Sequence, residues 1–156
     1  MRLIRCLALV ALGLMIVAAA PAAHAIDAVS VRSDAPAIDL TAVLDHQRSE
    51  ADRIQVSTAP GTDGIVRRIE VRAREGGQNW VVFALANNTD DQLDRLIVAP
   101  HYRIVSSGLL WPDLGLSRIA TITPSTGDRP ERQESATADI FRITLDPGAV
   151  ITFVAE

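Results

Sequence analysis

The sequence has no lysine, one cysteine and few aromatic residues: two tryptophans, one tyrosine and three phenylalanines among 156 residues. The cysteine, Cys6, falls in an apolar N-terminal segment, so the rest of the chain offers no disulfide, thiol nucleophile or cysteine metal site. After that segment only His46 and His101 remain, fifty-five positions apart and without ligand spacing. A structural metal needs several convergent ligands, so we expect neither a metal nor a cofactor.

A catalytic constellation is also missing. The serines at 106–107 lie near His101, but no Gly-x-Ser-x-Gly elbow surrounds them. The acids at 90–91 and Asp94 have the setting of turn and surface residues rather than of paired catalytic carboxylates. We therefore predict no catalytic residue and a protein that is not an enzyme. A secreted hydrolase that uses surface acids is the least favoured alternative.

The N-terminus has the layout of a secretory signal. Arg2 and Arg5 precede an uncharged apolar run over 6–20, and Ala23 and Ala25 supply the small side chains that signal peptidase requires. The apolar run is shorter than the roughly 20 residues that span a bilayer as a helix. We expect a cleaved signal peptide over 1–25 and a periplasmic mature domain over 26–156, with no membrane span in the mature chain.

The expected mature domain is acidic. It keeps 13 of the 15 arginines and all 19 acidic residues, for a net charge of −6. This charge argues against binding to nucleic acid and against electrostatic docking on anionic lipid. The arginines form no cluster, so we expect no anion site built from them.

The mature segment reads as β structure, because no helix-period pattern of convincing length follows residue 26. Residues 52–58 and 67–74 alternate between apolar and polar side chains, and the turn over 75–78 contains two adjacent glycines. The segment 80–86 (WVVFALA) is apolar on both faces, which predicts a strand in the middle of a sandwich. Trp80, within it, is expected in the core.

Shorter signals complete the pattern. We expect strands over 28–32, 37–44, 93–98, 118–123, 138–145 and 150–155, a polar connection over 46–52, an exposed loop over 125–137 and a tight turn over 146–148. Eight to ten short strands with turns at this spacing are typical of a sandwich or barrel. The apolar run at 150–154, near the last residue, is expected to form an exposed edge strand.

Binding residues are sought where aromatic and charged groups gather. His101, Tyr102 and Arg103 lie near Trp111 and Asp113 in sequence. Aromatic faces stack on sugar rings or other flat ligands, and Arg or Asp fixes polar groups. We take these five residues as ligand-binding candidates. A packing role for Trp111 and a structural role for His101 are the open alternatives.

Two stretches resemble a known family. Residues 80–97 (WVVFALANNTDDQLDRLI) and 141–154 (FRITLDPGAVITFV) are similar to the extracytoplasmic sensor domains of bacterial membrane signalling proteins, of the seven-transmembrane diverse intracellular signalling module type. Segments 67–80, 98–115 and 127–148 extend the resemblance to the periplasmic N-termini of alphaproteobacterial proteins with EAL phosphodiesterase and GGDEF cyclase-like modules. The resemblance implies a jelly-roll-like antiparallel β-sandwich that precedes membrane and cyclic-di-GMP output modules.

The chain itself carries no EAL or GGDEF sequence. The resemblance therefore implies a non-catalytic sensory or ligand-binding domain, truncated before its membrane and output modules. Its partner is expected to be a small ligand such as a carbohydrate, or a periplasmic or membrane protein. The alternative is a free-standing periplasmic module that binds carbohydrate or protein.

Overall fold

The computed structural model describes residues 25–104, 110–112 and 118–156, and almost all of their regular structure is β. The strands are β1 (Ala28–Val31), β2 (Asp45–Arg48), β3 (Arg53–Ser57), β4 (Arg68–Arg72), β5 (Asn79–Asn87), β6 (Leu93–Pro100), β7 (Tyr102–Ile104), β8 (Leu110–Pro112), β9 (Ile122–Pro124), β10 (Glu131–Gln133), β11 (Ala138–Leu145) and β12 (Val150–Ala155). A 3₁₀ turn, η1 (Thr41–Val43), precedes β2. Over the described ranges, none of the helical structure has the length and apolar character that a membrane crossing requires.

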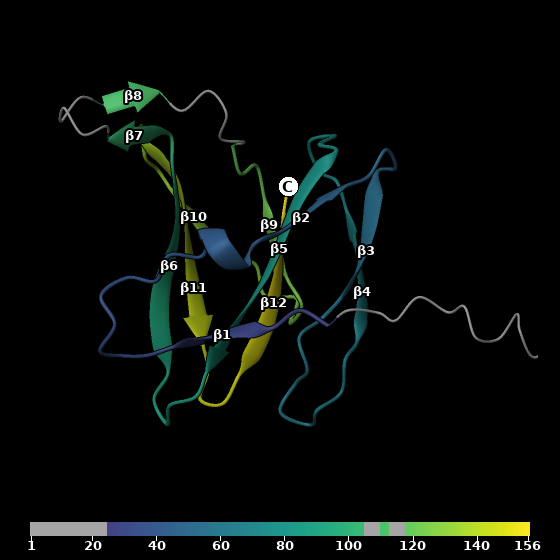
Figure 1. The fold of residues 1–156 in the computed structure, drawn as a ribbon, viewed down its shortest axis with the longest axis vertical. Helices are drawn as coiled ribbons and strands as arrows, with labels where there is room; N and C mark the ends of the chain where they lie inside the picture. The colour runs from purple at the N-terminus through teal and green to yellow at the C-terminus, as the bar shows by residue number, and fades with distance from the viewer. Residues whose placement is uncertain (1–24, 105–109, 113–117) are drawn as a thin grey trace, which may run out of the picture.

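Three layers build the body of the domain (Figure 1). The middle layer is a sheet of order β1-β5-β12-β9, with β2 also paired to β5. A sheet of order β10-β11-β6 covers one face of it, and the β3–β4 hairpin covers the other. All strand pairs are antiparallel except β1 with β5. The predicted all-β fold, an antiparallel β-sandwich, is confirmed.

The larger core lies between the two sheets. Phe83 on β5 is directly opposite Phe153 on β12, and their rings stack with centroids 5.3 Å apart. They pack against apolar residues of the covering sheet: Leu93, Phe141, Ile143 and Leu145. Each such side chain contributes about 1.5–3 kcal/mol through burial, so this layer contact carries much of the stability.

A second core lies under the β3–β4 hairpin. Trp80 and Val82 of β5 point to this side, where they meet Ile54, Val56 and Val71 of the hairpin. Since successive residues of a strand point to opposite faces of the sheet, Trp80 and Val82 lie on one face of β5, and Phe83 and Leu85 lie on the other. The prediction that 80–86 is buried on both faces is confirmed, as is the core position of Trp80, which is 1% exposed.

Four segments differ from expectation. In the segment 118–123, expected as a strand, only the last two residues are in a strand, because β9 begins at Ile122. Residues 37–44, expected as a strand, contain η1 instead. The polar segment at 46–52 contributes most of β2, which pairs with β5, and the expected loop at 125–137 contains β10, which pairs with β11. In both cases the strand forms through backbone hydrogen bonds to a strand that is already anchored. Its own side chains remain largely exposed, so no apolar alternation marks it.

The prediction of an exposed edge at 150–154 is wrong. Strand β12 pairs with β5 on one side and with β9 on the other, and its residues after Val150 are buried. The short strand β9 closes the edge that the sequence pattern left open.

A buried amide closes one end of the sandwich. The Asn87 side chain is fully buried, and its Nδ2 donates to the backbone oxygens of Asp91 (2.8 Å), Leu145 (2.9 Å) and Asp146 (3.1 Å). Its Oδ1 accepts from the N–H of Thr89 at 3.0 Å. One side chain therefore joins the β5–β6 turn to the β11–β12 turn.

Replacing Asn87 by alanine is expected to lower the free energy of unfolding by about 2–3 kcal/mol, because several backbone groups lose their partner in a buried site. Urea unfolding followed by circular dichroism measures this loss. The neighbouring Asn88→Ala is the control, since Asn88 is exposed and its substitution should stay within about 0.5 kcal/mol. Equal effects of the two substitutions would contradict this role for Asn87.

Candidate functional site

A buried carboxylate marks the most polar part of the interior. Asp139 is the second residue of β11, and only 4% of its surface is exposed. It shares the inward face of the strand with Phe141, Ile143 and Leu145. A charged group in such a position is stable only when it is paired and hydrogen-bonded.

Both oxygens of Asp139 have donors. Arg132 Nη2 lies 2.9 Å from Oδ1, and His101 Nε2 lies 3.1 Å from Oδ2. The N–H of Ile119 also donates to Oδ2, at 3.1 Å. The carboxylate thus joins β11 to β10, to the end of β6 and to the segment that leads into β9.

These contacts set the protonation of the site. Burial by itself favours the neutral acid, but the hydrogen bonds from His101 and Ile119 and the positive charge of Arg132 outweigh it and hold the pKa of Asp139 below its ordinary value. An acid whose pKa is lowered stays ionised at neutral pH and is a weak proton acceptor. The arrangement therefore suits a structural anchor better than a general base.

His101 lies at the junction of β6 and β7. Its N–H donates to the Thr137 carbonyl at 2.8 Å, and its side chain is 7% exposed. Arg118 Nη1 lies 3.2 Å from the same Nε2 that faces Asp139. A protonated Nε2 cannot accept a hydrogen bond, so the contacts of His101 with Arg118 and with Asp139 exclude each other, and the ring tautomer selects between them. Across the described ranges, His101 Nδ1 is buried without a partner.

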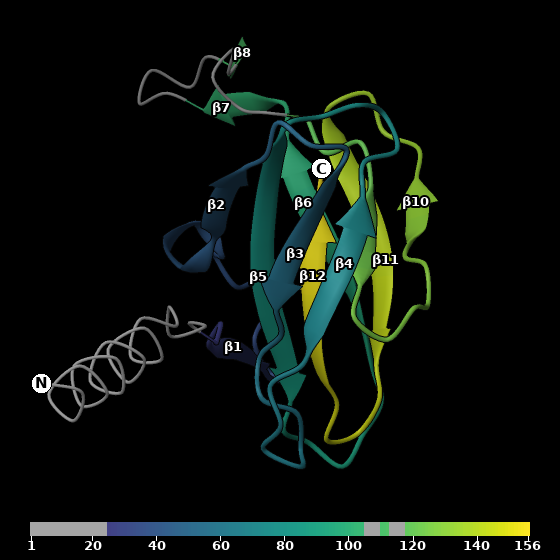
Figure 2. The same ribbon diagram turned by 90° about the vertical axis from the view of Figure 1, so that its right-hand side faces the viewer.

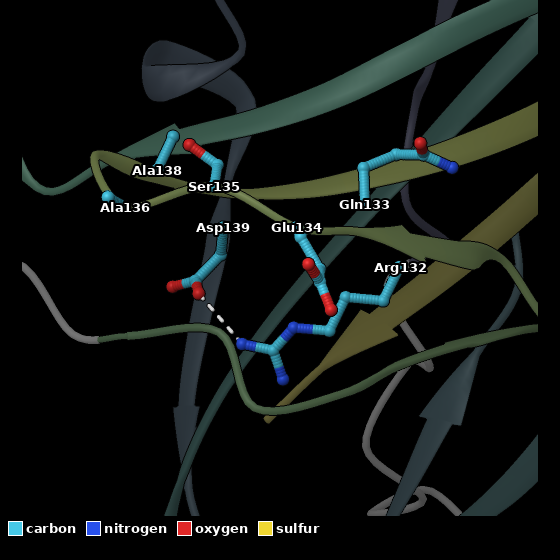
Figure 3. Close-up of a pocket in the computed structure, with 7 residues that line it drawn as sticks. All are labelled: Arg132, Gln133, Glu134, Ser135, Ala136, Ala138 and Asp139. Atoms are coloured by element: carbon cyan, nitrogen blue, oxygen red, sulfur yellow. Dashed lines mark hydrogen bonds and ion pairs between the residues drawn. The ribbon is translucent and has the colours of Figure 1, made fainter.

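A shallow groove of about 670 Å³ opens beside the carboxylate (Figure 3). It is lined by the end of β10, the turn after it and the start of β11: Arg132, Gln133, Glu134, Ser135, Ala136, Ala138 and Asp139. The Arg132 guanidinium, half exposed, also lies over the Phe141 ring, 5.7 Å from its centroid. A ligand in this groove would meet the guanidinium of Arg132 and the carboxylate of Glu134, which has no hydrogen-bond or ion-pair partner among the described residues.

Three other sequence candidates, Tyr102, Arg103 and Trp111, belong to the β7–β8 hairpin, which projects beyond the layers at one end of the domain (Figures 1 and 2). Tyr102 is 38% exposed. Arg103 and Trp111 occupy directly opposite positions of the hairpin, although their side chains lie outside the described residues. Asp113 lies outside them altogether. The backbone thus brings Arg103 and Trp111 together, whereas His101 is turned into the body of the domain.

Comparison with family models, with curated proteins and with solved structures gives no match. The site therefore has to be interpreted from its own geometry. Within the described ranges, no three His, Cys, Asp or Glu residues are grouped so as to hold a metal ion.

The sequence analysis missed the centre of this cluster. The strand expected over 138–145 includes Asp139 but assigns it no role, and the expectation that the arginines form no cluster leaves Arg118 and Arg132 without a partner. The sequence does contain a signal for its burial. Asp139 lies two residues before Phe141 and four before Ile143, so it is on the same face of the strand as these apolar side chains. An acid on the apolar face of a strand predicts a buried charge, and hence a partner elsewhere in the chain.

Asp139→Asn is expected to lower the free energy of unfolding by about 3 kcal/mol at pH 7, because it removes the negative charge and puts an NH2 donor where one carboxylate oxygen accepts a hydrogen bond. Since the folded-state pKa of Asp139 is lowered, the stability it provides is present above about pH 4 and is lost as pH falls through the folded-state value. The gap between wild type and Asp139→Asn should therefore close in acid. Urea unfolding from pH 7 to pH 3 measures it.

Asp94→Asn is the matched control. Asp94 lies on the neighbouring strand and pairs with Arg142 at 3.0 Å, but both side chains are about half exposed. Screening by solvent makes such a pair weak, so the substitution should change stability little. A comparable loss in both variants would show that burial of Asp139 is not the cause.

Proposed function

We propose that this chain is the non-catalytic, periplasmic sensory domain of a cyclic-di-GMP signalling protein, exported by the leader at residues 1–25. EAL or GGDEF output modules belong to parts of that protein that are not in this sequence. The proposal rests on the resemblance of residues 80–97 and 141–154 to such sensor domains. The structural observation that supports a sensory role is a continuous set of hydrogen bonds between the hairpin end of the domain and the end of β12.

The segment 119–121 forms that connection. The N–H of Ile119 donates to the carboxylate of Asp139. The carbonyl of Ala120 accepts a hydrogen bond from Arg132 Nη1 at 3.3 Å. The N–H of Ala120 donates to the backbone oxygen of Glu156 at 2.8 Å, and the carbonyl of Thr121 accepts from the Glu156 N–H at 3.0 Å. A displacement of Asp139 or Arg132 would therefore move the segment 119–121, and with it Glu156, the residue that follows β12.

The hairpin supplies the ligand contact in this proposal. Trp111 and Arg103 combine an aromatic face with a planar guanidinium, a pair suited to a sugar ring or to a peptide carboxylate. His101 follows β6 and immediately precedes β7, so movement of the hairpin acts on His101 and through it on Asp139. A ligand that binds one arrangement of this end better than another shifts the population between them.

Trp111→Ala is expected to weaken binding of a sugar ligand by about tenfold or more, because the stacking face is lost. Titration calorimetry of the purified chain with soluble chito-, cello- and malto-oligosaccharides measures this effect. Arg142→Ala, on the exposed face of β11, is the control and should leave affinity and thermal midpoint unchanged. Unchanged affinity in Trp111→Ala would count against the hairpin as the binding element.

A free-standing module that binds carbohydrate or protein is the second candidate, and the same hairpin supports it. The coding sequence beyond codon 156 separates the two. Continuation into membrane segments and an EAL or GGDEF module agrees with the sensory domain, whereas a stop codon followed by unrelated sequence in close relatives favours the module.

Export has its own test. Replacing Ala23 and Ala25 together by leucine should block cleavage, because signal peptidase accepts only small side chains at these positions. Immunoblotting of cell fractions should then show a membrane-associated precursor about 25 residues longer than the periplasmic wild-type product. A wild-type chain that keeps its leader and remains in the cytoplasm would overturn the localisation.

A further inference from the structure

The turn between β4 and β5 forms a second polar site, away from Asp139. Three of its backbone N–H groups converge on the side-chain carboxylate of Glu156. Arg74 N lies 2.7 Å from Oε2, while Glu75 N and Gly77 N lie 3.1 Å and 2.7 Å from Oε1. No arginine side chain takes part in these three bonds: the donors are main-chain amides.

The shape of the turn depends on its two glycines. Gly76 has a φ of +74°, in the left-handed region that favours glycine. At Gly77 an added Cβ would lie 2.8 Å from Glu156 Cγ and 3.0 Å from Oε1. The space over Gly77 is therefore filled by the carboxylate itself. Successive amides curved around an anion in this way form a nest, an arrangement that binds phosphate and other anions in many proteins.

The ionised form is the one that the turn prefers. Burial opposes the charge of Glu156, but the N–H groups of Arg74, Gly77 and Glu75 outweigh it and hold the pKa of Glu156 below its ordinary value. The turn is also open to solvent, since Arg74, Glu75 and Gly76 are exposed. An anion from outside can therefore reach the same amides once Glu156 withdraws.

We propose that the turn at 74–77 is an oxyanion-binding site whose occupant in this structure is the carboxylate of Glu156, and that the carboxylate or phosphate group of an external ligand takes its place. Glu156 is then an internal competitor that closes the site and ties the end of β12 to the β4–β5 turn. This inference rests on the turn alone and is independent of the proposed sensory function.

The test compares wild type with Glu156→Ala, each purified after expression of the full chain. Sodium acetate and inorganic phosphate are titrated in turn at constant ionic strength, and the amide resonances of Arg74, Glu75 and Gly77 are followed by NMR. A tethered carboxylate acts at a high effective concentration, so the variant should bind about tenfold or more tightly than wild type. The acetate and phosphate arms show which class of oxyanion the site prefers.

The double variant Glu156→Ala, Gly77→Ala is the matched control, because the new Cβ fills the position of the anion. Saturable shifts in Glu156→Ala that disappear in the double variant are the expected result. No shift in Glu156→Ala, or equal shifts in both variants, overturns the proposal. If Glu156→Ala does not fold, Glu156→Gln keeps the size of the side chain and removes its charge. It too must bind phosphate more tightly than wild type, and failure to do so is an overturning result.

Discussion

The burial of both faces of β5 is the constraint from which the layered architecture follows. A strand that is apolar on one face needs one covering layer, but β5 carries Phe83 and Leu85 on one face and Trp80 and Val82 on the other. Two layers must therefore cover it, and the chain supplies the β10-β11-β6 sheet and the β3–β4 hairpin. Strands on both sides of β5 then satisfy its backbone groups. The sequence contains no cysteine after Cys6, so no disulfide can join the layers and the burial of apolar side chains has to hold them together.

Polar side chains have a different role, since they close the ends that apolar packing leaves open. Asn87 joins two turns at one end. At the other end, Asp139 accepts from the N–H of Ile119, and the carboxylate of Glu156 accepts from N–H groups of the β4–β5 turn. A buried polar group with all its partners fixes one arrangement of the chain more narrowly than apolar contact does.

The sequence predicts a strand when the strand's own side chains determine its position, and it fails when a neighbouring strand determines it. Alternation and the two-faced apolar run locate β3, β4, β5, β11 and β12, because these strands owe their place to their own side chains. Strands β2 and β10 owe theirs to the strand beside them: Gln47 pairs with Trp80, and Arg132 with Phe141. No local pattern encodes a neighbour, so both segments were expected as connections.

The candidate site divides along the same line. His101 was found because polar and aromatic residues cluster in sequence around it. Its partner Asp139 lies thirty-eight positions later, and only the pairing of β6 with β11 brings the two together. The anion-binding turn has still less signal, because its donors are backbone amides that every sequence possesses. Two glycines predict the turn, but they do not predict which carboxylate enters it.

The carboxylates of Asp139 and Glu156 make one end of the domain sensitive to acid. This is the end at which the β7–β8 hairpin and the last residue of the chain lie (Figure 2). Both Asp139 and Glu156 have lowered pKa values, so the stability that each contributes is present near neutral pH and is lost as pH falls through its folded-state value. Protonation of Asp139 weakens its bond to the N–H of Ile119, and protonation of Glu156 weakens its bonds to the β4–β5 turn. The two effects meet at residues 119–121, because the backbone of Glu156 is bonded to Ala120 and Thr121. The apolar side chains that pack on the two faces of β5 do not titrate. Acid should therefore open this end locally before the layers separate, and the part of the molecule that can change its arrangement is the part where both proposed sites lie.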